Sequence, residues 1–354
     1  MGSSKKSSRS IVRNAKKLFR FLEQKKTELS PLLILTHDYP DPDALASAYA
    51  LQYLADKVFG IQSRIVYGGV IGRMENRSMA RILKLPVHKL KAGELKKYDR
   101  VALIDTQPGF KNNSFPPNRR AAIIIDQHPP VSKPVADLAI IDTECGATSV
   151  ILSQALLLAG CEIPGKLATS LAYGILTDTL NLYRAQSPGI INVYNAILPN
   201  CDMRSLALIQ NPLRSRRFFA TLRRGIHQAM VRRGLVISHL GPVESPDLVA
   251  QITDFLLTYK GIRWAFCTGR YKSKLYVSLR LTRAGMEASD VLRDIFDNRG
   301  DAGGHGLIGG GSFKISRPED EALWEEVEQT FDDRLVKRLR IPAKSEFYYH
   351  FRKA

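Results

Sequence analysis

Residues 32–44 read LLILTHDYPDPDA, and this stretch decides how the chain is interpreted. A continuous apolar run gives way to His37, Asp41 and Asp43, after which a helical pattern begins at residue 44. A run without polar alternation is typical of a strand that is buried on both faces of a sheet. Acidic groups packed this closely repel one another unless a cation lies between them. The stretch therefore predicts a buried strand whose end carries metal ligands.

Similar apolar runs recur through the first half of the chain. We expect strands over residues 32–36, 64–67, 101–104, 121–125 and 138–141, and helices over 44–56, 76–83, 148–159 and 166–175. Apolar strands separated by helices are typical of an α/β fold with a mostly parallel sheet covered on both faces. Ligands bind such sheets beyond the carboxyl ends of the strands, where His37, Asp105 and Asp126 lie.

The second half of the chain differs in character. Pro188, Gly189 and Pro199 mark the change, and residues 194–230 read as helical and rich in arginine. Further on, strands are expected over 235–239, 264–269 and 275–281, and helices over 250–258, 288–294 and 320–338. We therefore predict a second, smaller α/β domain with a cleft between the two domains.

The predicted division of the chain has five parts. They are a basic N-terminal helix and tail (1–30, with the helix over 11–26), a metal-binding catalytic domain (31–190), an Arg-rich helical linker (191–233), a substrate-binding domain (234–340) and a basic tail (341–354).

The composition is that of a globular protein. The chain has 354 residues, of which 44% are hydrophobic and 24% charged, and no apolar run approaches the roughly 20 residues of a membrane-spanning helix. Its four cysteines are scattered without C-x-x-C spacing, so we expect reduced packing residues in a cytoplasmic protein that has no membrane partner.

The net charge of +18 lies at the periphery of the sequence. Residues 1–30 carry +7, residues 204–233 carry +8 and residues 334–354 carry +6, which leaves about −3 for the remainder. Basic segments of this kind attract polyanions, although solvated surface charge explains the same pattern. The arginines of the linker are candidates for guiding single-stranded nucleic acid, and we expect Phe218 and Phe219 to pack in the core.

Acidic residues also stand at the ends of later apolar runs. Asp105, Asp126 and Asp178 each do so, and His128 follows Asp126 by two residues. Any one aspartate at such a position could cap a helix or close a turn, a role that best fits Asp142. The combination is hard to explain by capping alone. A set rich in oxygen with one or two imidazoles suits Mn²⁺ or Mg²⁺, and two such ions can clamp a phosphoryl displacement.

These motifs, in this order, resemble those of the DHH phosphoesterase family. The segments HDYPDPDALAS, VALIDT, IIIDQH and GILTDT are similar to its four motifs. The segment GDAGGHGLIGGG is similar to the glycine-histidine motif of the DHH-associated C-terminal domain, and VSLR looks like the Ser-x-Arg strand of that domain. The resemblance spans about residues 30–315, and the nearest branch is the stand-alone nanoRNase and pAp-phosphatase type, which is related to RecJ.

The resemblance implies how the metal ligands are shared between two ions. His37 and Asp41 would hold one Mn²⁺ or Mg²⁺ ion, Asp43 and Asp178 would hold the other, and Asp105 would bridge both.

The resemblance also implies roles in catalysis and substrate binding. Asp126 would orient the cluster, and His128 would contact the scissile phosphate or the leaving group. The residues implied to bind the far end of the substrate are Ser278, Arg280, Gly303, Gly304 and His305.

Gln127 departs from the family pattern, because it occupies the place of a ligand histidine. Its carbonyl oxygen can coordinate Mn²⁺ or Mg²⁺ but donates electrons more weakly than imidazole, so Gln127 is an additional candidate ligand. We expect a two-metal phosphoesterase that hydrolyses short oligonucleotides (nanoRNA), dinucleotides or pAp-type nucleotides by in-line attack of water. The alternative is a weakly active or inactive nucleotide-binding sensor. The expected partners are short single-stranded RNA or DNA or small nucleotides, and a homodimer fits the sequence.

Overall fold

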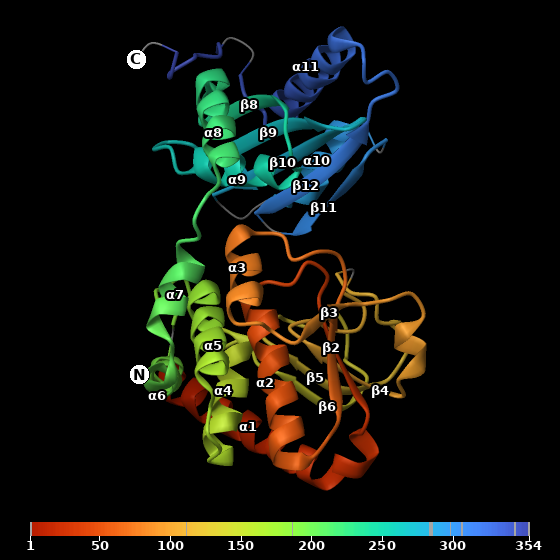
Figure 1. The fold of residues 1–354 in the computed structure, drawn as a ribbon, viewed down its shortest axis with the longest axis vertical. Coiled ribbons are helices and arrows are strands. Elements are labelled where there is room, and N and C mark those ends of the chain that lie inside the picture. The colour runs from red at the N-terminus through yellow and green to blue at the C-terminus, as the bar shows by residue number, and fades with distance from the viewer. Residues whose placement is uncertain are drawn as a thin grey trace. The chain divides into compact units, whose positions relative to one another are not determined.

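The structure is a computed structural model that describes residues 2–110, 112–185, 187–282, 286–297, 299–305, 307–342 and 345–352, without the side chains of 2–7 and 304–305. The chain divides into two compact units, Met1–Pro212 and Leu213–Ala354, and most of their elements are labelled in Figure 1. The division falls inside the arginine-rich stretch 191–233. The units separate within this stretch because Ile197 packs in a core of the first unit and Phe218 packs in a core of the second.

The first unit is built on a six-stranded parallel sheet in the order β3-β2-β1-β4-β5-β6. Its strands are β1 (Leu32–Thr36), β2 (Ser63–Tyr67), β3 (Val87–Lys89), β4 (Arg100–Ile104), β5 (Ala121–Asp126) and β6 (Ala136–Ile141). The predicted α/β class and parallel sheet are thus confirmed. The sequence does not reveal β3, because its three residues VHK form no apolar run and none of them is buried.

Helices complete the first unit. They are α1 (Gly2–Leu29), α2 (Pro42–Phe59), α3 (Met74–Ile82), α4 (Thr148–Ala159), α5 (Gly165–Asp178), α6 (Pro188–Ile197) and α7 (Met203–Gln210), with 3-10 turns η1 (Glu94–Lys97) and η2 (Leu198–Asn200). The helical stretch predicted over 194–230 is broken near Pro199 and Pro212, because proline cannot donate a backbone hydrogen bond within a helix. No described helix has both the length and the apolar character needed to cross a membrane.

The two faces of this sheet are covered in different ways. Leu32 and Ile34 of β1 point into the larger core, which they share with α1, α2, α4 and α5. Leu33 and Leu35 point to the opposite face, where Phe115 and the segment around η1 cover them. The described residues of the connections from β4 to β5 and from β5 to β6 form no helix, so loops take the place of the expected second helical layer.

The second unit contains a mixed sheet in the order β11-β12-β10-β9-β8-β7, in which only β8 and β9 pair in parallel. Its elements are α8 (Arg216–Gln228), β7 (Met230–Arg232), β8 (Leu235–Pro242), α9 (Asp247–Leu257), β9 (Trp264–Tyr271), β10 (Lys274–Leu281), α10 (Ala288–Phe296), β11 (Asp301–His305), β12 (Ile308–Lys314) and α11 (Glu321–Arg338). This unit is the predicted second α/β body.

The glycine-rich stretch of this unit forms the antiparallel pair β11–β12. A Cβ on Gly309 would lie 2.9 Å from the backbone oxygen of Ala288 in α10, and one on Gly311 would lie 2.5 Å from a backbone oxygen of β11. These two glycines therefore allow close packing. A Cβ on Gly303, in contrast, would meet no atom of the described residues within 4 Å.

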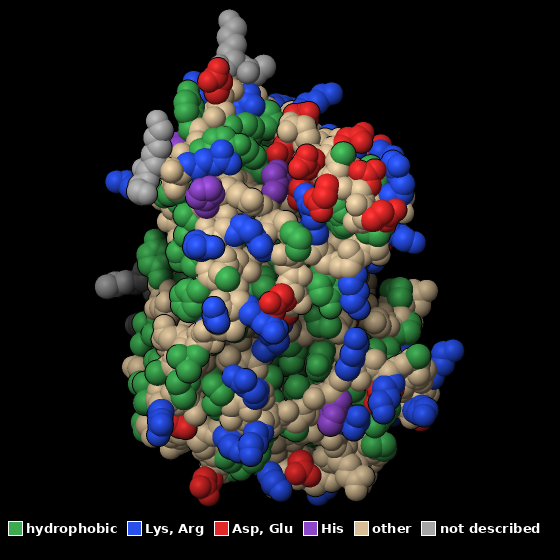
Figure 2. Space-filling view, turned by 45° about the horizontal axis from the view of Figure 1, so that its top comes forward, with side chains coloured by type: hydrophobic (Ala, Val, Ile, Leu, Met, Phe, Trp, Pro, Cys, Tyr) green, Lys and Arg blue, Asp and Glu red, His purple; other side chains and the backbone are tan. Residues whose placement is uncertain are grey.

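Charge is distributed unevenly between the surface and the interior. On the face shown in Figure 2, Lys and Arg side chains are widely spread, whereas Asp and Glu gather mainly at the upper right. The acidic residues Asp43, Asp105 and Asp126 are buried. The first unit thus keeps carboxylates inside, where water cannot screen them.

Candidate metal centre

Three neighbouring parallel strands bring the candidate site together. β1 and β4 pair with each other, and β4 pairs with β5. His37 follows the last residue of β1, Asp105 follows the last residue of β4, and Asp126 ends β5. These three side chains therefore leave the sheet at one edge, as the sequence predicts for a ligand site.

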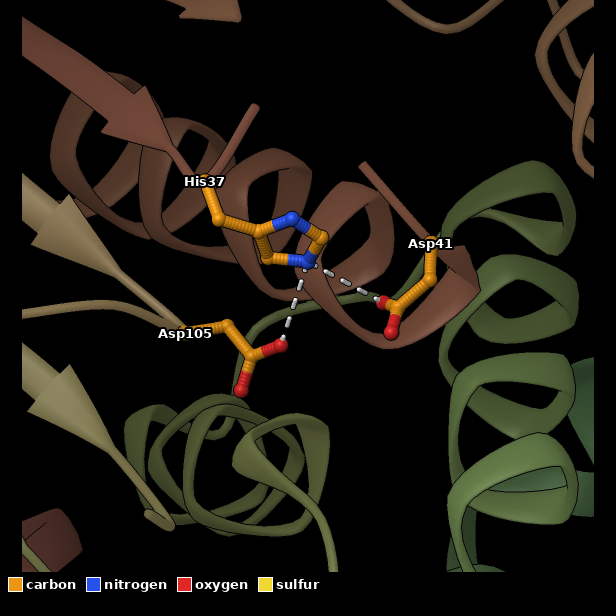
Figure 3. Close-up of side chains that lie close together, drawn as sticks. All are labelled: His37, Asp41 and Asp105. Carbon is orange, nitrogen blue, oxygen red and sulfur yellow. Dashed lines mark ion pairs between the residues drawn. The ribbon is translucent and has the colours of Figure 1, made fainter. Parts of the chain in front are cut away.

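His37 lies between two carboxylates (Figure 3). Its Nε2 is 3.7 Å from Asp105 Oδ2 and 3.8 Å from Asp41 Oδ1. Its Nδ1 lies 2.8 Å from the backbone oxygen of Asp38, which can only accept a hydrogen bond, so Nδ1 carries the proton in the neutral ring. Nε2 is then left with a lone pair that faces the carboxylates, which is the arrangement of a metal-ligating histidine.

A second group contains Asp105, Asp126 and His128. The Nδ1 atom of His128 is 2.8 Å from Asp126 Oδ1 and 3.8 Å from Asp105 Oδ1. The backbone N–H of His128 also donates to Asp126 Oδ1 at 3.1 Å. Because of its hydrogen bond with Asp126, the pKa of His128 is raised to about 9. Asp126 thus fixes the orientation of a half-exposed imidazole.

Asp105 is common to both groups, each of which offers ligand atoms within 4.8 Å of one another. Its side chain is buried, and its backbone has a left-handed φ of 58° that carries the chain away from β4. The hydroxyl of Thr148 donates to Asp105 Oδ1 at 2.8 Å. This carboxylate therefore has a fixed position between the two imidazoles.

Asp43 and Asp178 belong to neither of these groups in the described structure. The oxygens of Asp43 accept hydrogen bonds from the backbone N–H groups of Thr148, at 2.7 Å, and Ser149, at 2.8 Å. The amide nitrogen of Gln127 donates to Asp178 Oδ2 at 2.5 Å and to Asp43 Oδ2 at 3.3 Å. Gln127 therefore lies between the two carboxylates that the family resemblance assigns to the second ion.

Burial makes negative charge costly at this site. Burial and the charge of Asp41 raise the pKa of Asp105 to about 6. Burial and the charge of Asp105 raise the pKa of Asp43 well above its ordinary value, and burial with the charge of Asp43 does the same for Asp178. Burial lowers the pKa of His37, but the hydrogen bond and charge of Asp41 outweigh it and raise that pKa to about 10. These oxygen-rich donors fit a hard divalent cation, whose charge would offset the repulsion.

Several residues that support the site are not evident from the sequence. Gln107 is buried, and its amide nitrogen donates to Asp126 Oδ2 at 2.7 Å and to the backbone oxygen of His128 at 2.9 Å. Thr148 and Ser149 contact Asp43 or Asp105 from the start of α4. The only available signal is a polar residue just after a strand or at the first turn of a helix.

The substrate-binding residues predicted in the second unit lie on β10 and β11. Arg280 is buried, and its Nε donates to Asp254 Oδ1 at 2.6 Å while its Nη1 donates to Ser278 Oγ at 2.9 Å. The remaining residues of this set lie on β11: Gly303, Gly304 and His305. The side chains at positions 304 and 305 are outside the described part of the chain.

Comparison with known proteins gives two kinds of relative, although no protein-family model matches the chain. The chain is 31% identical over 337 residues to the uncharacterized protein MJ1633 of Methanocaldococcus jannaschii, covering 94% of this chain and 69% of that protein. Probable manganese-dependent inorganic pyrophosphatases of Streptococcus pyogenes are 26% identical over 155 residues, which cover 44% of this chain and 50% of the relative.

A solved structure extends the likeness to both units. An exopolyphosphatase-related protein from Bacteroides fragilis matches with a TM-score of 0.63 and 15% sequence identity, covering 91% of this chain and 97% of its own. The shared fold contains the parallel sheet that carries the four ordered motifs. The chain belongs to one family with the M. jannaschii protein, and its ordered motifs make it a member of the DHH phosphoesterase superfamily.

Proposed function

We propose that this protein is a metal-dependent phosphoesterase that hydrolyses short oligonucleotides, dinucleotides or pAp-type nucleotides. The main support is that Asp105 is shared by two ligand groups, one with His37 and one with His128. A buried carboxylate in this central position suits a ligand shared by two divalent ions at one phosphoryl centre. The pyrophosphatase relatives, which are named as manganese-dependent, support the choice of Mn²⁺ or Mg²⁺.

The proposed ligands combine the group of His37, Asp41 and Asp105 with the two carboxylates that the Gln127 amide contacts. They are His37, Asp41, Asp43, Asp105 and Asp178, with Gln127 as an additional ligand through its carbonyl oxygen. Two ions held there would supply an activated water and neutralise charge on the phosphoryl group. Asp41 Oδ1 also caps α2 by accepting from the backbone N–H of Ala44 at 3.0 Å, which fixes this carboxylate in the site.

His128 acts on the substrate in this proposal. With its Nδ1 held by Asp126, its Nε2 is available to donate a hydrogen bond to a phosphoryl oxygen or to the leaving group. A pKa of about 9 means that the ring is protonated at neutral pH and can donate from both nitrogens. Gln107 holds Asp126 from the other side and so keeps His128 in place.

The second unit is proposed to bind the far end of the substrate. The residues assigned to this role are Ser278, Arg280, Gly303, Gly304 and His305. The open space above Gly303 leaves its backbone accessible to an anion. Arg280 is held by Asp254, so it would position the hydroxyl of Ser278 as well as contribute charge.

Substrate profiling tests the proposal. RNAs of two to five residues, pAp and pyrophosphate are incubated with the full chain and added Mn²⁺ or Mg²⁺, and the released products are resolved by chromatography. We expect mononucleotides or phosphate to be released from the nucleotidic substrates. Activity should fall in His128→Gln but not in His88→Gln, which removes an exposed histidine of β3. No release from any of these nucleotides with either metal would refute the proposal.

The position of Gln127 favours a second candidate, a nucleotide-binding sensor with little or no turnover. Its amide nitrogen already supplies donors to Asp43 and Asp178, so it partly replaces the charge of a second ion. Calorimetry that shows dinucleotide binding without product formation would support the sensor. In that case Gln127→His should tighten binding of Mn²⁺ and create activity, whereas an active wild-type protein excludes this candidate.

A further inference from the structure

A hollow of about 380 Å³ lies beside α8 in the second unit. Its charged lining comes from Arg216, Arg217 and Arg224 on one side of α8, while Pro242 at the end of β8 and Glu244 face them. Arg217 and Arg224 are seven residues apart and so share one side of the helix, and Arg216 lines the same hollow from the first turn of α8. The hollow is therefore strongly basic.

The positive charge in this hollow is only partly balanced. Glu244 pairs with the Nε of Arg217 at 2.5 Å, and the Nη2 of Arg224 donates to the backbone oxygen of Pro242 at 2.6 Å. The Nε of Arg224 is buried without an acceptor among the described residues. Within the same part of the chain, Arg216 forms no ion pair or hydrogen bond through its side chain. An anion with several oxygens would satisfy these donors.

An exposed aromatic ring lies on the same helix. The side chain of Phe219 is 59% exposed, which shows that the expectation of a core position was wrong for this residue, whereas Phe218 is buried. Phe219 stands three residues after Arg216 and four before Arg223, so it shares their exposed side of α8. Its ring makes an edge contact with Phe218 at 5.5 Å between centroids. The 59% exposure of the side chain leaves much of the ring accessible.

We propose that α8 and its hollow form a binding site for single-stranded nucleic acid, here called the α8 site (Arg216, Arg217, Phe219, Arg223 and Arg224). A backbone phosphate would bind in the hollow at Arg216, which stands three residues before Phe219, and a neighbouring base would stack on Phe219. Cationic side chains with an exposed aromatic ring are the usual combination in proteins that bind single strands. Inorganic phosphate and polyphosphate share the chemistry of the hollow but cannot use the ring, and a duplex keeps its bases paired. The site does not depend on hydrolysis.

Binding of a fluorescein-labelled 12-residue single-stranded RNA to the full chain tests this proposal. Anisotropy is measured in EDTA, which prevents hydrolysis, over a series of salt concentrations. Phe219→Ala should weaken binding roughly 5- to 100-fold at fixed salt. Arg216→Gln should weaken binding and reduce the slope of log K against log salt by about 0.7, the value for one phosphate contact on a single strand. Arg204→Gln removes the same charge from an exposed position of α7 and should change the affinity for RNA little.

Three results would overturn the α8 site. They are an equal loss of affinity in Arg204→Gln and Arg216→Gln, unchanged affinity in Phe219→Ala, and equal affinity for duplex and single-stranded RNA. Full displacement of the RNA by inorganic phosphate at matched ionic strength would show an adventitious anion site and would also overturn it. A protein that binds RNA as expected but hydrolyses no nucleotide would refute the proposed function and leave the α8 site standing.

Discussion

Each unit buries a histidine among carboxylates, but the two clusters balance their charge differently. In the second unit, the Nε2 of His239 lies 2.9 Å from Asp332 Oδ2, and the Nη2 of Arg270 lies 3.1 Å from Glu328 Oε2. Each buried carboxylate there has a cationic partner from the chain itself. In the first unit, no described Lys or Arg forms an ion pair with Asp43 or Asp105.

In the first unit, the hydrogen-bond donors that contact the buried carboxylates are neutral apart from the histidines. Amide groups of Gln107 and Gln127, the hydroxyl of Thr148 and backbone N–H groups contact its carboxylates. Neutral donors stabilise a carboxylate but do not cancel its charge. The same residue types therefore form a self-compensated cluster where arginine is present and a cation-seeking cluster where it is absent. This difference, more than the presence of histidine and aspartate, marks the first unit as the metal centre.

The largest expected effect comes from Asp105→Asn. Loss of the shared carboxylate should lower phosphoesterase activity by about 10³-fold or more. The same change should raise the melting temperature of EDTA-treated protein, because it removes a buried charge that has no cationic partner other than histidine. Asparagine also tolerates the left-handed backbone at this position. Calorimetric scans in EDTA would compare wild type, Asp105→Asn and the exposed control Asp99→Asn. A lower melting temperature for Asp105→Asn than for wild type would contradict this account.

The opposite response is expected in the second unit. Arg270→Met removes the arginine partner of the buried Glu328 and leaves it only the more distant His239, so the free energy of unfolding should fall by about 3 kcal/mol. Both tryptophans, Trp264 and Trp324, belong to this unit, so their fluorescence during urea unfolding reports on it alone. Arg293→Met is the control, because its ion pair with Asp290 is exposed and should contribute at most about 1 kcal/mol. Equal effects of the two substitutions would remove the distinction between the clusters.

A smaller effect is expected when a neutral donor is lost from the metal centre. Gln107→Leu removes the amide that holds Asp126 and His128, and activity at saturating Mn²⁺ should fall about 10- to 100-fold, as for other residues that orient metal-site groups. Gln52→Leu removes an amide hydrogen bond to Ser63 outside the metal centre and is the matched control. Steady-state kinetics that gave the same activity for both variants would show that Gln107 does not position His128.

The smallest expected effect is a dependence of stability on pH in EDTA. The folded-state pKa of Asp105 is about 6 against an ordinary 3.8, and the pKa values of His37 and His128 are about 10 and about 9 against 6.5. A group with a raised pKa holds its proton more tightly when folded, so its stabilisation is complete below the unfolded pKa and is lost as pH rises through the folded one. Stability from Asp105 should therefore fall between pH 3.8 and 6, and stability from the histidines should fall between pH 6.5 and 10.

Comparing the melting temperatures of wild type and Asp105→Asn isolates the pH range from 3.8 to 6, in which Asp105 titrates. The difference in melting temperature between wild type and this variant should change between pH 3.8 and 6 and stay level just above it. Added Mn²⁺ should reverse the trend in wild type, because metal binds the deprotonated ligands. A pH-independent difference between the two proteins would contradict the assignment of Asp105 as a buried carboxylate without a compensating cation.

The parts of the fold that follow from local pattern are predictable from the sequence. β1 matches its predicted range, and α4 begins and ends where its pattern predicts. The pair β11–β12 is not predictable in this way, because its glycines have low strand propensity and form strands only through packing against α10. Phe219 shows the limit of assigning burial by residue type, since helix geometry places it away from the buried side that holds Phe218 and Thr221.

The candidate site likewise has some residues that a local sequence pattern predicts and some contacts that it does not. His37, Asp105 and Asp126 are predictable because each ends or follows an apolar run, and parallel strands bring such ends together. The contact of Thr148 with Asp105 joins residues 43 positions apart, so no local pattern contains it. The amide of Gln127 is a similar case. Its sequence position indicates a missing histidine, but only the structure shows that it donates to Asp43 and Asp178.

Asp43 connects the start of α2 to the first turn of α4, through the backbone N–H groups of Thr148 and Ser149. These two amide protons are a spectroscopic probe that the fold already contains. Diamagnetic Mg²⁺ drawing electron density from Asp43 would shift both resonances, and paramagnetic Mn²⁺ would broaden them beyond detection. Titration of ¹⁵N-labelled protein would thus report metal binding beside α4 without substrate and without any substitution.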